Sequence, residues 1–287
     1  MKDLSERELL QDTGDAADDH VKAGAQYTSQ PIVRVACLFG LLLLVSLAAM
    51  YAVLGDCEPL SEPLNKTLNE PLNEPLNDTT PLFITLGDSI TQIGAHPRLM
   101  GYQVMLTNTY VRKADVVNRG AAGTTTKWWL VKLPSLLRDW KLKPPTLLSI
   151  FLGVNDASLI NGVDRGLHVP LDEFTANLYT MIASINEAFP KCKILLIAAS
   201  AVDETSSWRT GRSNAEVSKY TNATINVARH LQLPVIDLFT PTFNDLSLFY
   251  DGLHLNSRGN IILHDLFVDT VRQSYPDLDP ETLPAAY

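Results

Sequence analysis

The sequence from Pro81 onward predicts a single doubly wound α/β domain, and three observations support this prediction. Short apolar segments alternate with longer segments that have the periodicity of amphipathic helices. The apolar segments mostly lack alternation of polar and apolar side chains, as expected for parallel strands that are covered on both faces. Glycine, asparagine and aspartate follow several of these segments, where loops leave the carboxyl edge of such a sheet.

Each element of the domain has its own signal in the sequence. The predicted strands are residues 82–86, 115–118, 146–152, 193–199 and 234–238. The predicted helices are residues 99–112, 125–139, 172–188, 213–231 and 258–273. Crossovers between parallel strands are right-handed, so the carboxyl ends of all the strands lie along one edge of the sheet. Functional side chains are therefore expected along that edge.

The chain begins with a polar segment and an apolar segment. Residues 1–34 are polar and acidic, which is typical of a disordered tail. Residues 35–54 carry no charge, and a helix of this length, at about 1.5 Å per residue, spans the roughly 30 Å core of a bilayer. We therefore expect a transmembrane helix. The alternatives are a buried core helix and a cleaved signal peptide, and the long polar segment before the run disfavours the second.

The flanks of this predicted helix indicate its orientation. Lys22 and Arg34 lie on its amino side and Asp56 and Glu58 on the other, which favours a cytoplasmic amino terminus and a lumenal or extracellular domain. Such a type II membrane protein would expose its Asn-x-Thr sequons to the glycosylation machinery. The candidate glycosylation sites are Asn65, Asn77 and Asn222.

A proline-rich linker joins the predicted helix to the domain. Residues 55–80 contain repeated tetrapeptides of the form Glu-Pro-Leu-Asn. Proline at every fourth position blocks a continuous helix and favours extended chain, so we interpret this linker as a stalk. The domain itself is expected to cover residues 81–275, with a short carboxyl-terminal tail at 276–287.

Charge and cysteine usage exclude several kinds of function. The net charge is −9, but residues 81–287 carry 18 basic and 19 acidic side chains and include no basic run, which argues against nucleic-acid binding. The cysteines at 37, 57 and 192 form no Cys-x-x-Cys or Cys/His cluster, so neither a zinc site nor a disulfide framework is indicated. No Gly-x-Gly-x-x-Gly follows the first strand, so a dinucleotide site is not predicted.

The residues that point to chemistry lie at opposite ends of the domain. Gly87-Asp88-Ser89 ends the first predicted strand, and Asp251 and His254 lie in the loop before the last helix. A serine hydroxyl needs an imidazole base, and the imidazole needs a carboxylate that holds its tautomer and orientation. The spacing Asp-x-x-His would let both side chains reach the same serine from one loop. These three residues are therefore the candidate catalytic triad.

An esterase also needs donors for the negatively charged oxygen of its intermediate. The backbone amides of Ser89 and Gly120 and the side-chain amide of Asn155 are the candidates. Each residue also has an ordinary structural alternative: Ser89 as a helix cap, Gly120 and Asn155 as turn residues, and His254 as a surface histidine. Their shared position after strands of one sheet favours a common site.

These motifs resemble a known family. The blocks Gly87-Asp88-Ser89, Gly120, Gly153-x-Asn155-Asp156 and Asp251-x-x-His254 resemble, in order, those of the SGNH hydrolases, also called the GDSL lipase/esterase superfamily. The segments 115–120, 169–178 and 251–255 are most similar to its isoamyl acetate-hydrolysing esterase branch. The resemblance implies a flavodoxin-like three-layer α/β/α sandwich with a parallel sheet. It implies the triad and the donors named above, and it implies no cofactor and no metal.

The segment after Gly120 departs from that branch. It reads Ala-Ala-Gly-Thr-Thr-Thr-Lys-Trp, where the branch tends to carry bulkier aromatic residues, so Thr124 and Trp128 are candidate substrate-binding residues. We predict a membrane-anchored serine esterase for small, acetyl-like esters, with the oligomeric state left open. The alternatives are a deacetylase of cell-surface glycans, a lipid esterase, and an inactive binding module tethered to a membrane.

Overall fold

The computed structural model describes residues 80–206 and 211–286. The predicted acidic tail, the predicted transmembrane helix at 35–54 and the stalk up to residue 79 lie outside these ranges. Within the described ranges, no helix is long and apolar enough to cross a membrane. The predictions for the amino-terminal 79 residues therefore stay predictions.

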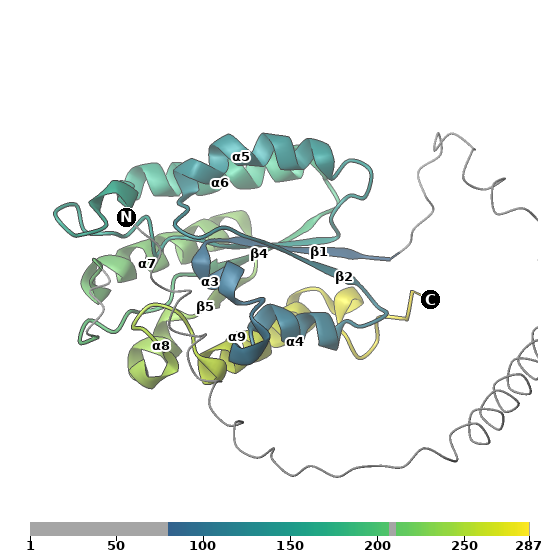
Figure 1. Cartoon of the computed structure of the whole chain (residues 1–287). Coiled ribbons are helices and arrows are strands. Elements are labelled where there is room, and N and C mark those ends of the chain that lie inside the picture. Colours follow the sequence, from purple (N-terminus) through teal and green to yellow (C-terminus); the bar gives the residue numbers. More distant parts are fainter. Residues whose placement is uncertain (1–79, 207–210, 287) are drawn as a thin grey trace, which may run out of the picture. The chain divides into compact units, whose positions relative to one another are not determined.

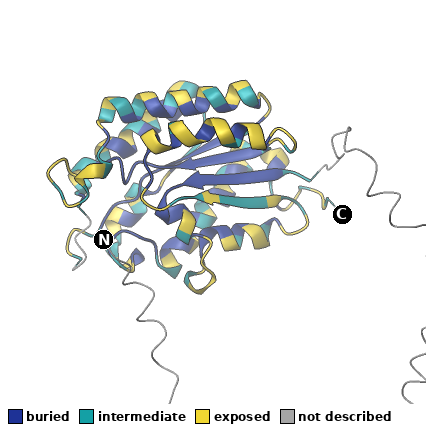
Figure 2. Ribbon diagram, turned by 45° about the horizontal axis from the view of Figure 1, so that its top comes forward, coloured by how far each residue is buried: buried dark blue, intermediate teal, exposed yellow. Residues whose placement is uncertain are grey.

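The described residues form a five-stranded parallel sheet with the strand order β2-β1-β3-β4-β5. All the predicted strands are confirmed, with ends that differ by two residues at most. The strands are β1 (Leu82–Gly87), β2 (Asp115–Gly120), β3 (Leu147–Phe151), β4 (Lys193–Ala198) and β5 (Val235–Asp237). β1, β3 and β4 are almost entirely buried, whereas β2, at one edge, is partly exposed (Figure 2).

Helices cover both faces of the sheet, as a doubly wound fold requires (Figure 1). On one face lie α5 (Thr126–Asp139), α6 (Leu171–Ala188) and α7 (Asn214–Leu231). On the other face lie α4 (Tyr102–Thr109) and α9 (Ser257–Ser274). Shorter helical segments are α3 (Ser89–Ile93), α8 (Phe239–Asn244), η1 (Pro97–Leu99), η2 (Arg165–Leu167), η3 (Leu246–Leu248) and η4 (Pro276–Leu278).

The predicted helix at 99–112 is wrong in its length and start. The structure has η1 first, then Met100 with a left-handed φ of 44°, and α4 begins only at Tyr102. Gly101 precedes α4, and a Cβ atom there would lie 2.0 Å from the carbonyl oxygen of Gly94. This close backbone contact requires a break in the helix that apolar periodicity does not reveal.

The strand order gives the sheet a switch point between β1 and β3. β1 lies between β2 and β3, and the chain leaves β1 toward one helical layer and β3 toward the other. The carboxyl ends of β1 and β3 therefore form the switch point of the sheet, where ligands bind in open α/β folds. Ser89 follows β1 at this point.

The carboxyl-terminal segment, predicted as a separate tail, packs on the domain. The side chain of Leu278 is buried, and its carbonyl oxygen accepts a hydrogen bond of 3.0 Å from the Tyr110 hydroxyl at the end of α4. Farther along, the amide of Ala286 donates to the carbonyl oxygen of Arg112 at 2.7 Å. Residues 276–286 thus cover the edge of the molecule where α4 leads into β2.

Candidate active site

The turn after β1 presents the Ser89 hydroxyl to the carboxyl edge of the sheet. Asp88, not Ser89, caps α3, because Oδ1 of Asp88 accepts a hydrogen bond of 2.9 Å from the Ile90 amide. Ser89 is the first helical residue, so its hydroxyl is not used as a cap. Gly87 allows the turn, since a Cβ atom there would lie 2.1 Å from Oγ1 of Thr91.

The structure brings the three predicted triad residues together. Nε2 of His254 lies 2.8 Å from Oγ of Ser89, and Nδ1 of His254 lies 2.6 Å from Oδ2 of Asp251. When Nδ1–H donates to the carboxylate, Nε2 carries the lone pair that accepts the Ser89 hydroxyl proton. The hydrogen bonds therefore run continuously from hydroxyl to imidazole to carboxylate across 165 positions of the chain.

The loop that carries Asp251 and His254 is held in a tight turn. Oδ1 of Asp251 accepts hydrogen bonds from the amides of Leu253 (3.0 Å) and His254 (2.8 Å). Gly252 has a φ of +93°, which strongly favours glycine, and a Cβ atom there would lie 2.5 Å from Cβ of Ser206. Burial would raise the pKa of Asp251, but the hydrogen bonds from the His254 ring and these amides outweigh it and lower the pKa.

A tyrosine next to the triad went unnoticed in the sequence. The ring of Tyr250 stacks on the His254 ring with an interplanar angle of 20° and a centroid distance of 5.8 Å. Tyr250 is half exposed, so it covers one face of the imidazole from the solvent side. No sequence pattern marks it, because the contact depends on the short antiparallel bridge between Phe249 and Leu255.

Asn155 lies buried at the carboxyl end of β3 with its side-chain amide fixed from both ends. Nδ2 donates to the carbonyl oxygen of Thr124 at 2.9 Å, and Oδ1 accepts from Nη2 of Arg212 at 2.6 Å. These two bonds determine which end of the amide is the donor. Because Nδ2 has two hydrogens, one N–H stays available for a ligand.

The backbone amide of Gly120, a predicted oxyanion donor, already donates to another group. It is the last residue of β2, and its amide donates to Oδ1 of Asn118 at 2.7 Å. A Cβ atom on Gly120 would lie 2.1 Å from the Gln92 nitrogen, so this glycine permits β2 to pack directly against α3. Its role in the described structure is close packing, and the prediction for its amide is not supported by the geometry.

The turn after β2 contains another glycine with different properties. The amides of Ala121, Ala122 and Thr124 donate, respectively, to the Gly87 carbonyl, the Gln92 side chain and the Ala121 carbonyl. The amide of Gly123, which has a φ of +71° and is exposed, has no hydrogen-bond partner among the described residues. The sequence offered two glycines in this turn, but it did not show which amide is free.

The two predicted substrate-binding residues differ in their surroundings. The buried Thr124 hydroxyl donates to the Ala121 carbonyl at 2.7 Å and accepts from Nε1 of Trp129 at 3.1 Å, so this side chain belongs to the framework. Trp128 is 40% exposed and packs edge-on against Trp129. Trp128 is thus accessible, whereas Thr124 contributes its backbone carbonyl to the orientation of Asn155.

Two buried carboxyl groups lie near the triad. Burial raises the pKa of Asp88 to about 6, partly offset by the Ile90 amide and by the charges of His254 and Arg212. Burial raises the pKa of Asp156 to about 7, although the Thr126 hydroxyl and amide donate to it. Oδ2 of each group has no hydrogen-bond partner in the described structure.

Across the described residues, no group of His, Cys, Asp and Glu side chains is arranged to hold a metal ion.

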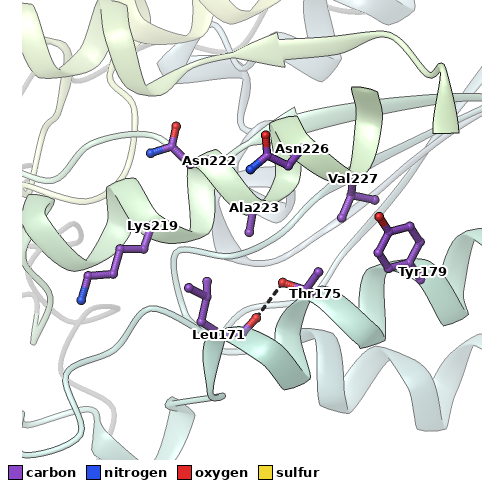
Figure 3. Close-up of a pocket in the computed structure, with 8 residues that line it drawn as sticks. All are labelled: Leu171, Thr175, Tyr179, Lys219, Asn222, Ala223, Asn226 and Val227. Carbon is purple, nitrogen blue, oxygen red and sulfur yellow. Dashed lines mark hydrogen bonds between the residues drawn. The ribbon is translucent and has the colours of Figure 1, made fainter. Parts of the chain in front are cut away.

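A separate pocket of about 420 Å³ lies between α6 and α7 (Figure 3). The residues that line it are Leu171, Thr175, Tyr179, Lys219, Asn222, Ala223, Asn226 and Val227. No triad residue lines this pocket. It includes the predicted glycosylation candidate Asn222, which is exposed on α7, while Thr224 of the same sequon is buried. The other two candidates, Asn65 and Asn77, lie outside the described residues.

Comparisons with known proteins identify the family of this chain. The model of the GDSL-like Lipase/Acylhydrolase family matches residues 85–261. The mouse protein named isoamyl acetate-hydrolyzing esterase 1 homolog is 35% identical over 198 residues, which cover 64% of this chain and 78% of the mouse protein. The crystal structure of a lipase/acylhydrolase from Enterococcus faecalis is 27% identical and has a TM-score of 0.54, covering 68% of this chain and 96% of that one.

A more distant structure shows the same fold. Axe2, an acetylxylan esterase from Geobacillus stearothermophilus, is 21% identical, has a TM-score of 0.54 and covers 67% of this chain and 94% of its own. The family match begins within β1 and continues through the turn after it, strands β2 to β5 and the loop with Asp251 and His254. The chain therefore belongs to the GDSL-like lipase/acylhydrolase family, has the α/β fold of the SGNH hydrolases, and is a carboxylic ester hydrolase.

Proposed function

We propose that this chain is a serine esterase in which Ser89 is the nucleophile, His254 the base and Asp251 the partner of that base. The observation that carries the proposal is the continuous hydrogen-bonded sequence from Oγ of Ser89 through the His254 ring to Oδ2 of Asp251. A serine used only as a helix cap would not need this arrangement, and Asp88 already supplies the cap.

The reaction follows from these contacts. His254 takes the Ser89 proton at Nε2 while Oγ attacks the ester carbonyl carbon, and Asp251 stabilises the imidazolium that forms. Collapse of the tetrahedral intermediate breaks the bond to the alcohol, which leaves with the proton from His254. Water, deprotonated by His254, then attacks the acyl-enzyme and releases the carboxylic acid and Ser89.

The negative oxygen of the intermediate needs donors that are in place before it forms. We assign this role to the remaining N–H of Asn155, the amide of Ser89 in the first turn of α3, and the amide of Gly123. The Ser89 amide has no acceptor within its own helix, as is general for a first turn. Gly123 replaces Gly120 in this assignment, because the Gly120 amide donates to Asn118.

We further propose that the substrate is an ester with a small acyl group such as acetate. Support comes from relatives named isoamyl acetate-hydrolyzing esterases, of which the mouse protein is 35% identical. The Schizosaccharomyces pombe protein named isoamyl acetate-hydrolyzing esterase is 30% identical over 206 residues. Longer lipid esters and acetylated glycans are the alternatives that a substrate series would distinguish.

The experiment is a chain-length series of p-nitrophenyl esters with the purified full-length chain. Wild type should turn over the acetate and butyrate esters best and should react with a fluorophosphonate probe, whereas Ser89→Ala should do neither. Peak turnover with long acyl chains would favour a lipid esterase. A folded wild type that neither turns over any ester nor reacts with the probe would overturn the proposal in favour of an inactive binding module.

We propose that residues 35–54 anchor this esterase in a membrane, with the catalytic domain on the lumenal or extracellular side. The support is their uncharged, apolar composition and the basic flank on the amino side. Full-length chain should stay with membranes after extraction at high pH, and a chain without residues 35–54 should not. Release of the full-length chain by that treatment would contradict the anchor.

A further inference from the structure

Arg212 is a buried arginine that faces the end of β3. Its side chain is only 2% exposed, although arginine is among the residues least often buried. Nε donates to the Val154 carbonyl at 2.6 Å, Nη2 to Oδ1 of Asn155 at 2.6 Å, and Nη1 to Oδ2 of Asp164 at 2.8 Å. All three acceptors belong to the segment that follows β3, so one guanidinium holds that segment from 154 to 164.

Burial of the Arg212 charge costs free energy, and favourable packing of the side chain does not account for its position. Removing a guanidinium from water is unfavourable unless its hydrogen bonds and charges are well satisfied. The acidic partner Asp164 is itself 41% exposed, which weakens its attraction through solvent screening. The two short bonds to Val154 and Asn155, by contrast, lie in the buried interior. The side chain is thus directed at the residue that carries the proposed oxyanion donor.

We propose that Arg212 is a positioning residue for ester hydrolysis that acts through Asn155. This inference rests on the proposed function, in which the amide of Asn155 stabilises the oxyanion. Arg212 does not touch the substrate in this scheme. It holds Oδ1 of Asn155, which leaves Nδ2 to donate to the Thr124 carbonyl and, in this scheme, to the reacting oxygen.

The charge of Arg212 has a second effect on the same donor. A hydrogen bond from a guanidinium is charge-assisted, and it draws electron density from the amide that accepts it. Hydrogen bonds in series polarise one another, so the N–H groups of Asn155 become stronger donors. The Arg212 charge also favours a lower pKa of the buried Asp88, next to Ser89, although burial outweighs it.

Lysine would not replace this arginine. The planar guanidinium directs its donors in fixed, separate directions, whereas an ammonium group is a compact charge on a flexible chain. Arg212→Lys would keep the positive charge but could not hold Val154, Asn155 and Asp164 together. The substitution therefore separates the geometric effect from the effect of charge alone.

A double-mutant cycle between Arg212 and Asn155 tests the inference in the full-length chain with p-nitrophenyl acetate. Arg212→Lys and Arg212→Met should lower kcat by about 10- to 100-fold with KM within about 3-fold, and Asn155→Ala should lower kcat by about 10²- to 10³-fold. In the Asn155→Ala background, either Arg212 substitution should lower kcat by no more than about 3-fold further, because the donor it positions is gone.

The matched control is Arg272→Lys, an arginine that also contacts acidic side chains but lies at the end of α9, remote from Ser89. This variant should keep the wild-type kcat. Thermal unfolding of each variant, with assays well below its midpoint, removes loss of folded protein from the comparison. Arg212→Lys keeps the test possible if Arg212→Met does not fold.

The outcomes separate this inference from the proposed function. The inference would be overturned if the fold losses of kcat from the Arg212 and Asn155 substitutions multiply in the double variant. It would also be overturned if Arg212→Lys keeps the wild-type kcat. Neither result would contradict the proposed serine esterase. A wild type without turnover and without reaction with a fluorophosphonate would instead overturn the proposed function. Loss of kcat by Arg212→Lys that disappears in the Asn155→Ala background would support the positioning role.

Discussion

Two of the histidines in the described structure have the same hydrogen-bonding pattern. His254 connects Ser89 to Asp251, and His264 connects the Thr109 hydroxyl (2.9 Å) to the Asp265 carboxylate (2.9 Å). The second set joins α4 to α9 on a helical face, away from the carboxyl edge of the sheet. The position of the His254 set at the carboxyl edge of the sheet, together with its hydrogen bonds, therefore supports its proposed role.

This pair of histidines gives a matched test of the proposed base. His254→Gln should lower ester turnover by about 10³-fold or more, because the nucleophile loses its proton acceptor. His264→Gln removes a similar set of bonds between helices and should leave kcat within about 2-fold of wild type, with a small loss in thermal stability. Equal loss of kcat in the two variants would contradict the assignment of His254.

At the residue scale, the sequence was informative where a motif joins residues that act together. Asp251 and His254 share one turn, and Ser89 follows the first strand, so spacing and topology could predict that the three side chains lie close together. The proposed role of Arg212 was not predictable, because it depends on a contact with Asn155, 57 positions earlier in the chain. The hydrogen bond from the Gly120 amide to the Asn118 side chain, which leaves the prediction for this amide without geometric support, was not predictable from the sequence for a related reason.

Gly120 permits the close contact between β2 and α3. A Cβ atom at Gly120 would overlap the backbone of Thr91 and Gln92, with a distance of 2.1 Å to the Gln92 nitrogen. Gly120→Ala should therefore displace α3, lower the free energy of unfolding by about 1–3 kcal/mol or more, and reduce kcat because α3 carries Ser89.

Gly123 provides the comparison for this substitution. A Cβ atom there meets no other atom within 4 Å, and the cost of Gly123→Ala comes from its φ of +71° alone. We expect a smaller loss of about 1 kcal/mol. Urea unfolding of both variants measures the difference, and a greater destabilisation by Gly123→Ala would be inconsistent with the packing described for β2 and α3.

Asp156 connects three elements from a buried position. Its Oδ1 accepts from the amide (3.0 Å) and hydroxyl (2.5 Å) of Thr126 at the start of α5, and that hydroxyl accepts from Asn177 of α6 at 3.1 Å. Burial raises the pKa of Asp156 from 3.8 to about 7. The native state thus keeps a proton between about pH 4 and pH 7 that the unfolded chain releases.

The consequence is a loss of stability as the pH rises. Because the native state binds more protons in this window, the free energy of unfolding falls with increasing pH, by about 2–4 kcal/mol from this group between pH 4 and pH 8. Asp156→Asn keeps the acceptor at Oδ1 and cannot ionise. The free energy of unfolding of Asp156→Asn, measured with urea, should therefore rise relative to that of wild type by the same amount between pH 4 and pH 8. If the two free energies change in parallel with pH, the prediction is wrong.

At the element scale, the sequence predicted strands and long helices well and short helices poorly. The β4 strand is a continuous apolar run after Lys193, and α6 and α7 have several turns of amphipathic pattern. α3 has five residues and α8 has six, too few to show a periodicity. The break before α4 comes from a backbone contact between Gly94 and Gly101, which leaves no trace in hydropathy.

In the molecule as a whole, the candidate active site and the carboxyl-terminal segment lie at opposite edges of the sheet. Ser89 and His254 lie at the carboxyl edge of the sheet. Residues 276–286 lie at the opposite edge, against the end of α4 and the loop into β2. The sequence predicted the first arrangement from topology, but its short, proline-containing end carried no pattern long enough to predict the second.

This separation predicts that the carboxyl-terminal segment contributes to stability and not to chemistry. Removal of residues 276–287 exposes the site of Leu278 and breaks the hydrogen bond from Tyr110. Burial of a leucine contributes about 1.5–3 kcal/mol and the hydrogen bond about 1 kcal/mol, so we expect the free energy of unfolding to fall by about 2–4 kcal/mol.

The full-length variant Leu278→Ala should reproduce most of this loss, because it removes the same buried side chain without shortening the chain. For both proteins, kcat on p-nitrophenyl acetate should stay within about 2-fold of wild type at temperatures well below the unfolding midpoint, since the segment lies at the other edge of the sheet from the triad. A large fall in kcat of the still-folded Leu278→Ala protein would show that the two edges of the sheet are coupled. An unchanged kcat with a lowered midpoint would show that the active-site geometry is maintained by the sheet and the loops at its carboxyl edge.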